Sequence, residues 1–358
     1  MKKLLLLLLI AATHFAFAQT DSSKGSVTFS GYLEAYYAYD FNQPENHELP
    51  FFLYNFKRHN EVNLNLGLIN ANYTSSRVRA NFGLMAGTYP QYNLAAEQSL
   101  LRLVWQANIG LRLSSTKNVW LDAGILPSHI GFESAIGKDC AALSRSIIAE
   151  NTPYYESGLR LSYSTDDSKW YLAALVMNGW QRIARPDGNN TPAFGTQITF
   201  TPNQKITLNY STFIGNDKPD TLSQMRFYNN FYGVFHPTED FSVTIGFDYG
   251  VEQKPNEESG SNNVYSPVAI LKYQVTDKLA VAARGEFYND KNGIIIPTGT
   301  PDGFQTQGYS VNLDYSPFRN VLWRIEVRTL KSKDDIFNKD GEGRNTDTFA
   351  TTSLSVAF

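Results

Sequence analysis

The segment 127–153 carries a group of side chains that could do chemistry. It combines an imidazole, carboxylates and cations within a short stretch: His129, Glu133, Lys138, Asp139, Arg145 and Glu150. Such groups can exchange protons, ligate a metal ion or set the electric field inside a narrow passage. Which of these applies depends on the elements that position them.

Catalysis and metal binding find little support in the residue pattern. Ser128 and His129 are neighbours in sequence, but catalytic pairs are defined by spatial geometry rather than adjacency. A zinc site from His47, His59 and His129 would lack the close or helical spacing of such sites. The acidic stretch 334–342 fails as a calcium loop, because its glycine register puts an isoleucine where the first carboxylate is needed. We expect no enzymatic activity, no cofactor and no metal.

The start of the chain predicts export. Lys2 and Lys3 precede a short apolar run, which is too short to span a bilayer, and residues 16–18 (Ala-Phe-Ala) match a cleavage pattern. We expect a signal peptide at 1–18 and a short periplasmic lead at 19–26. The formal net charge of -3 argues against nucleic acid as a partner. A single cysteine, Cys140, cannot form an intrachain disulfide.

From residue 27 onward, apolar and polar residues alternate with the period of β-strands. In the second such segment, for example, Val62, Leu64, Leu66 and Leu68 are expected to share one face. One segment, 169–180, is apolar on both faces, which indicates a filled lumen, an inward loop or a subunit neighbour. The expected strands are 27–41, 61–71, 76–88, 100–113, 118–126, 155–164, 169–180, 194–201, 205–214, 225–236, 240–250, 263–275, 278–289, 304–315, 320–330 and 347–358.

The links between these segments alternate between short and long. This parity predicts an all-β fold: a transmembrane antiparallel up-and-down β-barrel at 27–358, of about 16 strands, with short periplasmic turns and long extracellular loops. Aromatic residues, 21 Tyr and 23 Phe, suit girdles at two membrane interfaces. A soluble sandwich is the alternative, but single domains of that kind are rarely this long. We therefore expect the outer membrane of a Gram-negative bacterium.

Three stretches of the chain resemble the OmpL-like β-barrel porin family (porin-2 type) of Bacteroidota. They are 128–134 (Ser-His-Ile-Gly-Phe-Glu-Ser) with 136–139 (Ile-Gly-Lys-Asp), 149–151 (Ala-Glu-Asn) with 153–158 (Pro-Tyr-Tyr-Glu-Ser-Gly), and 178–182 (Asn-Gly-Trp-Gln-Arg). The resemblance implies an outer-membrane barrel and a porin. It brings no established site residues, so no role is carried over to this chain.

The size of the barrel and the side chains that line it predict the function. A barrel of sixteen strands keeps an aqueous channel, so we expect a porin for passive diffusion of small hydrophilic solutes. The alternative is a closed barrel that acts as a structural or surface-binding protein. Candidate residues of the lumen wall are Glu34, Arg77, Arg79, Arg102, Arg112, Asp122, Arg160, Asp248, Arg284, Glu286, Asp314, Arg324, Glu326 and Arg328.

The segment 127–153 is expected to fold into the lumen as a constriction loop, where its charges act on passing ions. An external loop on the rim is the alternative. The arginines near the third, fourth and sixth strands could give a weak anion preference. We favour the alternative in which they pair with acids of the lumen and stiffen the wall.

The expected partners follow from the membrane setting. They are outer-membrane lipid and lipopolysaccharide, small hydrophilic solutes, and the barrel-assembly machinery, which would read the alternating last strand ending at Phe358. A homotrimer is compatible with sixteen strands, although no residue pattern requires one.

Overall fold

The computed structural model describes residues 25–255 and 259–358, so the expected signal peptide and nearly all of the lead lie outside the described residues. Sixteen strands form one closed antiparallel barrel in which sequential strands are neighbours. They are β1 (Ser26–Asp40), β2 (Val62–Thr74), β3 (Val78–Ala86), β4 (Val104–Arg112), β5 (Asn118–Pro127), β6 (Tyr155–Ser164), β7 (Trp170–Met177), β8 (Ala193–Asn203), β9 (Ile206–Asn216), β10 (Met225–Phe235), β11 (Phe241–Gln253), β12 (Ser261–Thr276), β13 (Leu279–Asp290), β14 (Phe304–Phe318), β15 (Val321–Ser332) and β18 (Thr346–Ala357).

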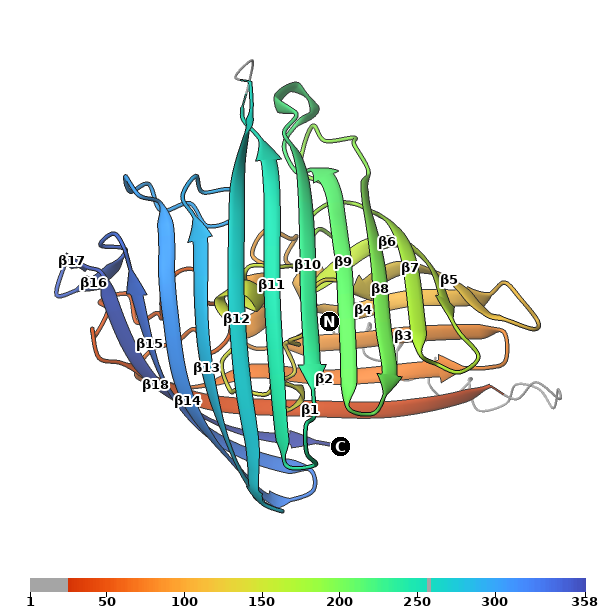
Figure 1. Ribbon diagram of the computed structural model, residues 1–358, viewed down its shortest axis with the longest axis horizontal. Coiled ribbons are helices and arrows are strands. Elements are labelled where there is room, and N and C mark those ends of the chain that lie inside the picture. Colours follow the sequence, from red (N-terminus) through yellow and green to blue (C-terminus); the bar gives the residue numbers. More distant parts are fainter. Residues whose placement is uncertain (1–24, 256–258) are drawn as a thin grey trace, which may run out of the picture.

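All sixteen predicted strands are present, and the parity of the links is confirmed. The connections after β2, β4, β6, β8, β10, β12 and β14 are short turns, and they gather at what we call the turn end. The longer connections gather at the opposite, loop end, where β16 (Phe337–Lys339) and β17 (Glu342–Arg344) form a small separate hairpin. Figure 1 shows β8 to β13 in front of β1 to β4, with a segment of chain between these two walls.

The ring closes between the first and last strands. β1 pairs with β18 in a register that sets Tyr32 opposite Ala357. Gly31 and Phe358 exchange two backbone hydrogen bonds, of 2.7 and 3.0 Å between nitrogen and oxygen. The aromatic ring of Phe358 lies where a side chain at Gly31 would stand.

We predict that Gly31→Leu weakens this seam. The added side chain collides with the Phe358 ring, and overpacking of this kind costs about 1–3 kcal/mol. The measurement is the temperature at which the folded band is lost in heat-modifiability gels. Gly285→Leu is the matched control, because nothing lies within 4 Å of a Cβ at that strand glycine. Equal midpoints for the two variants would contradict the prediction.

The outer surface of the barrel carries large exposed apolar side chains, among them Ile245, Phe247, Val311 and Val327. Their alternation with buried polar residues gives one apolar and one polar face per strand. Among the described residues, no helix has both the length and the apolar character needed to cross a membrane.

One predicted face is wrong. Leu66 and Leu68 of β2 are buried inside the barrel, whereas Val62 and Ile69 are exposed. The cause is a β-bulge: Glu34 pairs with Leu66 and Ala35 with Leu64, which leaves Asn65 as the extra residue. One extra residue shifts the alternation by one, so every later side chain of the strand changes face.

The interior at the loop end is packed with apolar side chains. The β1–β2 connection folds inward and buries Phe52 against Phe304 and Phe337, and Phe56 against Tyr36 of β1. The inward face of β7 contributes Ala173, Leu175 and Met177 to the same cluster. The two apolar faces predicted for 169–180 therefore correspond to an outward face and to this filled part of the lumen.

Candidate functional site

The connection between β5 and β6, residues 128–154, lies inside the barrel and is called the inner loop. It contains a short 3-10 turn at Gly137–Asp139 and one helical turn, α3 (Ile147–Glu150). Its residues contact opposite walls: Ala135 packs with Leu66 of β2, and Ile148 with Val268 of β12. The loop thus crosses the lumen from one wall to the other.

His129 fixes the point where the inner loop turns into the lumen. Its Nδ1 lies 2.7 Å from the Glu156 carboxylate and its Nε2 lies 2.8 Å from the Thr212 carbonyl oxygen of β9. Burial by itself would lower the pKa of His129, but the carboxylate of Glu156 and the carbonyl of Thr212 raise it overall. The environment favours a protonated ring that donates from both nitrogens.

Arg145 organises the loop from within. The side chain is buried, and its guanidinium donates to the backbone carbonyls of Ser134, Ala135 and Leu143, at 2.6 Å for Ser134 and 2.8 Å for Ala135. It also lies 5.6 Å from the ring centre of Phe56. Its charge therefore closes a turn of the loop instead of facing the lumen water.

Four charged side chains of the wall form what we call the anchoring quartet: Arg284 and Glu286 on β13, and Glu326 and Arg328 on β15. Arg284 is 2.9 Å from Glu326, and Arg328 is 2.6 Å from Glu286. All four side chains are at most 1% exposed. Two positive and two negative charges offset one another, which a buried group of this kind requires.

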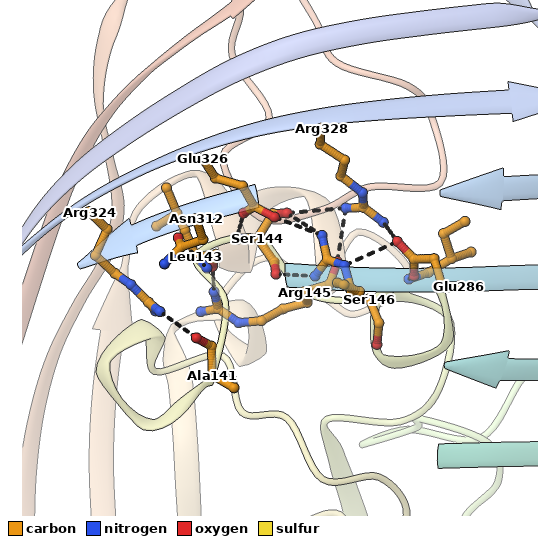
Figure 2. A network of polar contacts seen from close by, with 12 residues as sticks. Ala141, Leu143, Ser144, Arg145, Ser146, Glu286, Asn312, Arg324, Glu326 and Arg328 are labelled. Atoms are coloured by element: carbon orange, nitrogen blue, oxygen red, sulfur yellow. Dashed lines mark hydrogen bonds and ion pairs between the residues drawn. The ribbon is translucent and has the colours of Figure 1, made fainter. Parts of the chain in front are cut away.

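The anchoring quartet holds the backbone of the inner loop (Figure 2). Ser144 N–H donates to Glu326 at 2.5 Å and Ile147 N–H donates to Glu286 at 2.6 Å. In the other direction, Arg284 donates to the Ser144 carbonyl at 2.6 Å. Such charge-assisted bonds are roughly twice as strong as neutral ones, so the loop is fixed on the β13–β15 side of the barrel.

Two further contacts fix the ends of this bound segment. At the tip, Arg324 of β15 donates to the Gly137 carbonyl at 2.8 Å, and a Cβ at Gly137 would meet the Glu34 carboxylate of β1. At the end of α3, the buried Glu150 accepts from the backbone N–H of Tyr54, in the β1–β2 connection, at 2.9 Å. Burial raises the pKa of Glu150.

The six predicted loop residues thus divide into two groups. His129, Arg145 and Glu150 are buried and make structural bonds, and Glu133, whose pKa is raised by burial, accepts from Ser146. Lys138 and Asp139 are exposed at the tip and pair with one another at 2.5 Å. The prediction that this whole group faces passing ions is therefore wrong for the three buried residues.

The predicted wall residues also divide. Glu34, Arg324 and Arg328 are buried against the inner loop, while Arg79, Asp122 and Arg160 lie together near the turn end. Arg112 lies at the turn end of β4 and donates to the Lys117 carbonyl at 3.3 Å.

Two predicted wall residues lie elsewhere. Arg102 stands in a 3-10 turn at Leu101–Leu103, because β4 begins only at Val104, and it donates to the Ala95 and Glu97 carbonyls. Arg77 is exposed in the turn before β3. Alternating residues at a strand end look the same in sequence whether or not the backbone stays paired.

The β1–β2 connection is the part of the site that the sequence analysis missed. Its available signal was the apolar group Phe51, Phe52, Leu53 and Phe56, which is unusual for a solvated loop. Within residues 25–255 and 259–358, no group of three or more His, Cys, Asp or Glu side chains could hold a metal ion.

Comparison with known proteins places this barrel in a family. Residues 26–358 match the family model described as putative beta-barrel porin-2, OmpL-like. The chain belongs to this family. A search of curated proteins finds no match.

Solved outer-membrane proteins share the fold of this OmpL-like barrel at low identity. An anion-selective porin from Comamonas acidovorans has a TM-score of 0.62 at 9% identity, covering 94% of this chain and 100% of its own. The trimer form of OmpT from Vibrio cholerae has a TM-score of 0.61 at 9% identity, with 93% and 99% covered. The outer-membrane channel DcaP of Acinetobacter baumannii has a TM-score of 0.60 at 11% identity, with 95% and 99% covered.

Proposed function

We propose that this protein is an outer-membrane porin for passive diffusion of small hydrophilic solutes, with the inner loop as its constriction. The observation that carries the proposal is the polar, partly water-exposed lining that lies between the inner loop and the turn end of a sixteen-stranded barrel, for example at Arg79 and Arg160. Barrels of this size enclose aqueous channels. Membership of a porin family supports the same function.

The inner loop supports the constriction through its position. It is bound to the wall by charge-assisted bonds and reaches Glu34 near the middle of β1. Solutes that enter from either end would meet it before they could cross. The proposed transport is passive and involves no catalytic step.

Single-channel recording of the purified mature protein in planar bilayers tests the proposal. We expect discrete conductance steps whose size reflects the gap beside the inner loop. A correctly folded, heat-modifiable barrel that produces no steps over a wide range of protein concentration and voltage would refute the porin function.

A closed barrel with a surface-binding role is the second candidate. The apolar packing of Phe52, Phe56, Phe304 and Phe337 across the loop end favours it. So does a recess of about 370 Å³ among the loops, lined by aromatic and polar side chains that include Trp180 and Arg182. This volume lies within the roughly 300–1,000 Å³ typical of small-molecule sites. If the barrel does not conduct, this recess is the site to test for ligand binding.

We further propose that the turn end faces the periplasm and that the long loops face outward, toward lipopolysaccharide. Both described chain ends, near Ser26 and Phe358, then lie on the periplasmic side. This arrangement agrees with export through the N-terminal signal and with assembly machinery that reads the last strand. A trimer, as named for the OmpT relative, is a proposal that crosslinking would test.

A further inference from the structure

Two clusters of charge flank the lumen between the inner loop and the turn end. In the first cluster, Asp122 of β5 accepts two hydrogen bonds from Arg79 of β3, at 2.7 and 2.5 Å. Arg160 of β6 approaches the same carboxylate at 3.5 Å. One carboxylate is therefore shared by two guanidinium groups.

The second cluster also has two cations for one carboxylate. Asp314 of β14 accepts from Arg324 of β15 at 2.6 Å and from Lys272 of β12 at 2.8 Å. Again one carboxylate is shared by two cations. The anchoring quartet differs, because its two arginines are matched by two glutamates.

The two clusters lie on opposite walls. In the order of strands around the ring, β12, β14 and β15 stand across the barrel from β3, β5 and β6. Every one of the six residues belongs to the part of its strand next to the turn end. A solute between the inner loop and the turn end passes between them.

Most of the cations in the two clusters are more exposed to the lumen than the carboxylates, which strengthens the effect of the surplus positive charge. The carboxylates are hidden, since the side chains of Asp122 and Asp314 are only 1% and 5% exposed. Three of the four cations reach water: Arg79 is 32% exposed, Lys272 27% and Arg160 18%, whereas Arg324 is 0% exposed against the inner loop. A solute therefore meets ammonium and guanidinium groups before it meets a carboxylate.

Other charges do not cancel this surplus. Arg112 adds a further cation on the lumen side of β4, and Lys138 and Asp139 at the loop tip pair with one another. Among the described residues, the lumen side of the strands at this depth thus holds five cations, Arg79, Arg112, Arg160, Lys272 and Arg324, against three carboxylates, Glu34, Asp122 and Asp314. The sequence-based prediction is that the arginines pair with acids of the lumen. In each cluster, such pairing neutralises only one of the two cations.

We propose that this part of the lumen selects small anionic solutes over cations, by means of the two clusters. The inference rests on the proposed porin function and names its solute class. Low-dielectric walls focus the field of such a surplus and raise the local concentration of counter-ions. Because the cations are partly exposed, dissolved salt screens them, with a Debye length of about 10 Å at 0.1 M and about 3 Å at 1 M.

The test is the reversal potential under a KCl gradient. We expect the native channel to prefer chloride, with a smaller preference in molar salt than in dilute salt. The variant Arg160→Gln/Lys272→Gln leaves three cations, Arg79, Arg112 and Arg324, against the carboxylates of Glu34, Asp122 and Asp314. We therefore expect its permeability ratio to fall to about one. Lys333→Gln/Arg344→Gln is the control, because it removes the same charge from exposed pairs at the loop end.

The outcomes separate this inference from the porin function. A conducting native channel without chloride preference, or an unchanged preference in the Arg160→Gln/Lys272→Gln variant, would overturn the inference alone. If the barrel does not conduct, Asn81→Cys on the inner face of β3 reports the same field in detergent solution. There we expect a negatively charged methanethiosulfonate reagent to react faster than a positively charged one, and equal rates would refute the surplus.

Discussion

Removal of residues 135–143 is expected to raise the single-channel conductance of the barrel by about two- to threefold, because conductance follows the width of the narrowest part of a pore. These residues form the tip of the inner loop and lie against Arg324 of β15 and Glu34 of β1. The quartet bonds to Ser144 and Ile147 are left in place. Planar-bilayer recording measures the change.

The deletion removes the Ala135 and Leu143 carbonyls that Arg145 donates to, but it leaves the Ser134 carbonyl and the two ends of the loop in place. Glu133 and Ser146 are already hydrogen-bonded, at 2.9 Å between the Ser146 nitrogen and the carboxylate, so the ends of the gap lie close together. The matched control removes residues 339–342 from the tip of the β16–β17 hairpin, which is mostly exposed. Equal conductance in the native protein and the inner-loop variant would show that the loop does not limit the pore.

Glu286→Ala is expected to destabilise the folded barrel by about 3–5 kcal/mol, the cost of leaving a buried charge without its partner. Glu286 faces Arg328 at 2.6 Å and Arg284 at 3.2 Å, and it accepts the Ile147 N–H of the inner loop. The variant therefore loses charge balance and a loop anchor together. The measurement is the free energy of unfolding from urea titration in detergent, and current traces should also become noisier.

Two further variants show whether the loss of charge or the loss of the hydrogen-bond acceptor destabilises the barrel. Glu286→Gln keeps an acceptor for the Ile147 N–H and loses only the charge, so we expect an intermediate free energy of unfolding. Glu342→Ala breaks the exposed pair with Arg344, and we expect no measurable change. If Glu286→Ala unfolded at the same urea concentration as the native protein, the anchoring role of the quartet would be refuted.

The membrane fold could be predicted from the sequence because its cause is local. A strand that faces lipid on one side and water on the other must alternate, and short turns must follow every second strand. The order and number of the strands follow from those two patterns alone. The prediction failed where the backbone departs from regular pairing, at the Asn65 bulge and at the 3-10 turn that holds Arg102.

The contents of the lumen could be predicted only in part. The length and charge of 127–153 indicated an inward loop, and Arg284, Glu286 and Glu326 stood on inward faces. Their joint role depends on β13 and β15 both facing the same few atoms of that loop. No residue spacing in the sequence predicts that these side chains contact the same part of the loop. The inward fold of the segment with Phe52 and Phe56 likewise depends on residues far apart in the sequence.

The sequence by itself determined the barrel, its strand order and, apart from the bulged strand β2, which faces meet lipid, since these depend on neighbours two residues apart. The tertiary structure alone decided which charges are matched and which are in surplus. Arg79, Asp122 and Arg160 come from three strands, and closure of the ring brings them to one place opposite Lys272, Asp314 and Arg324. Charge balance is a sum over groups that are near in space, and distances between strands exist only once the barrel has closed.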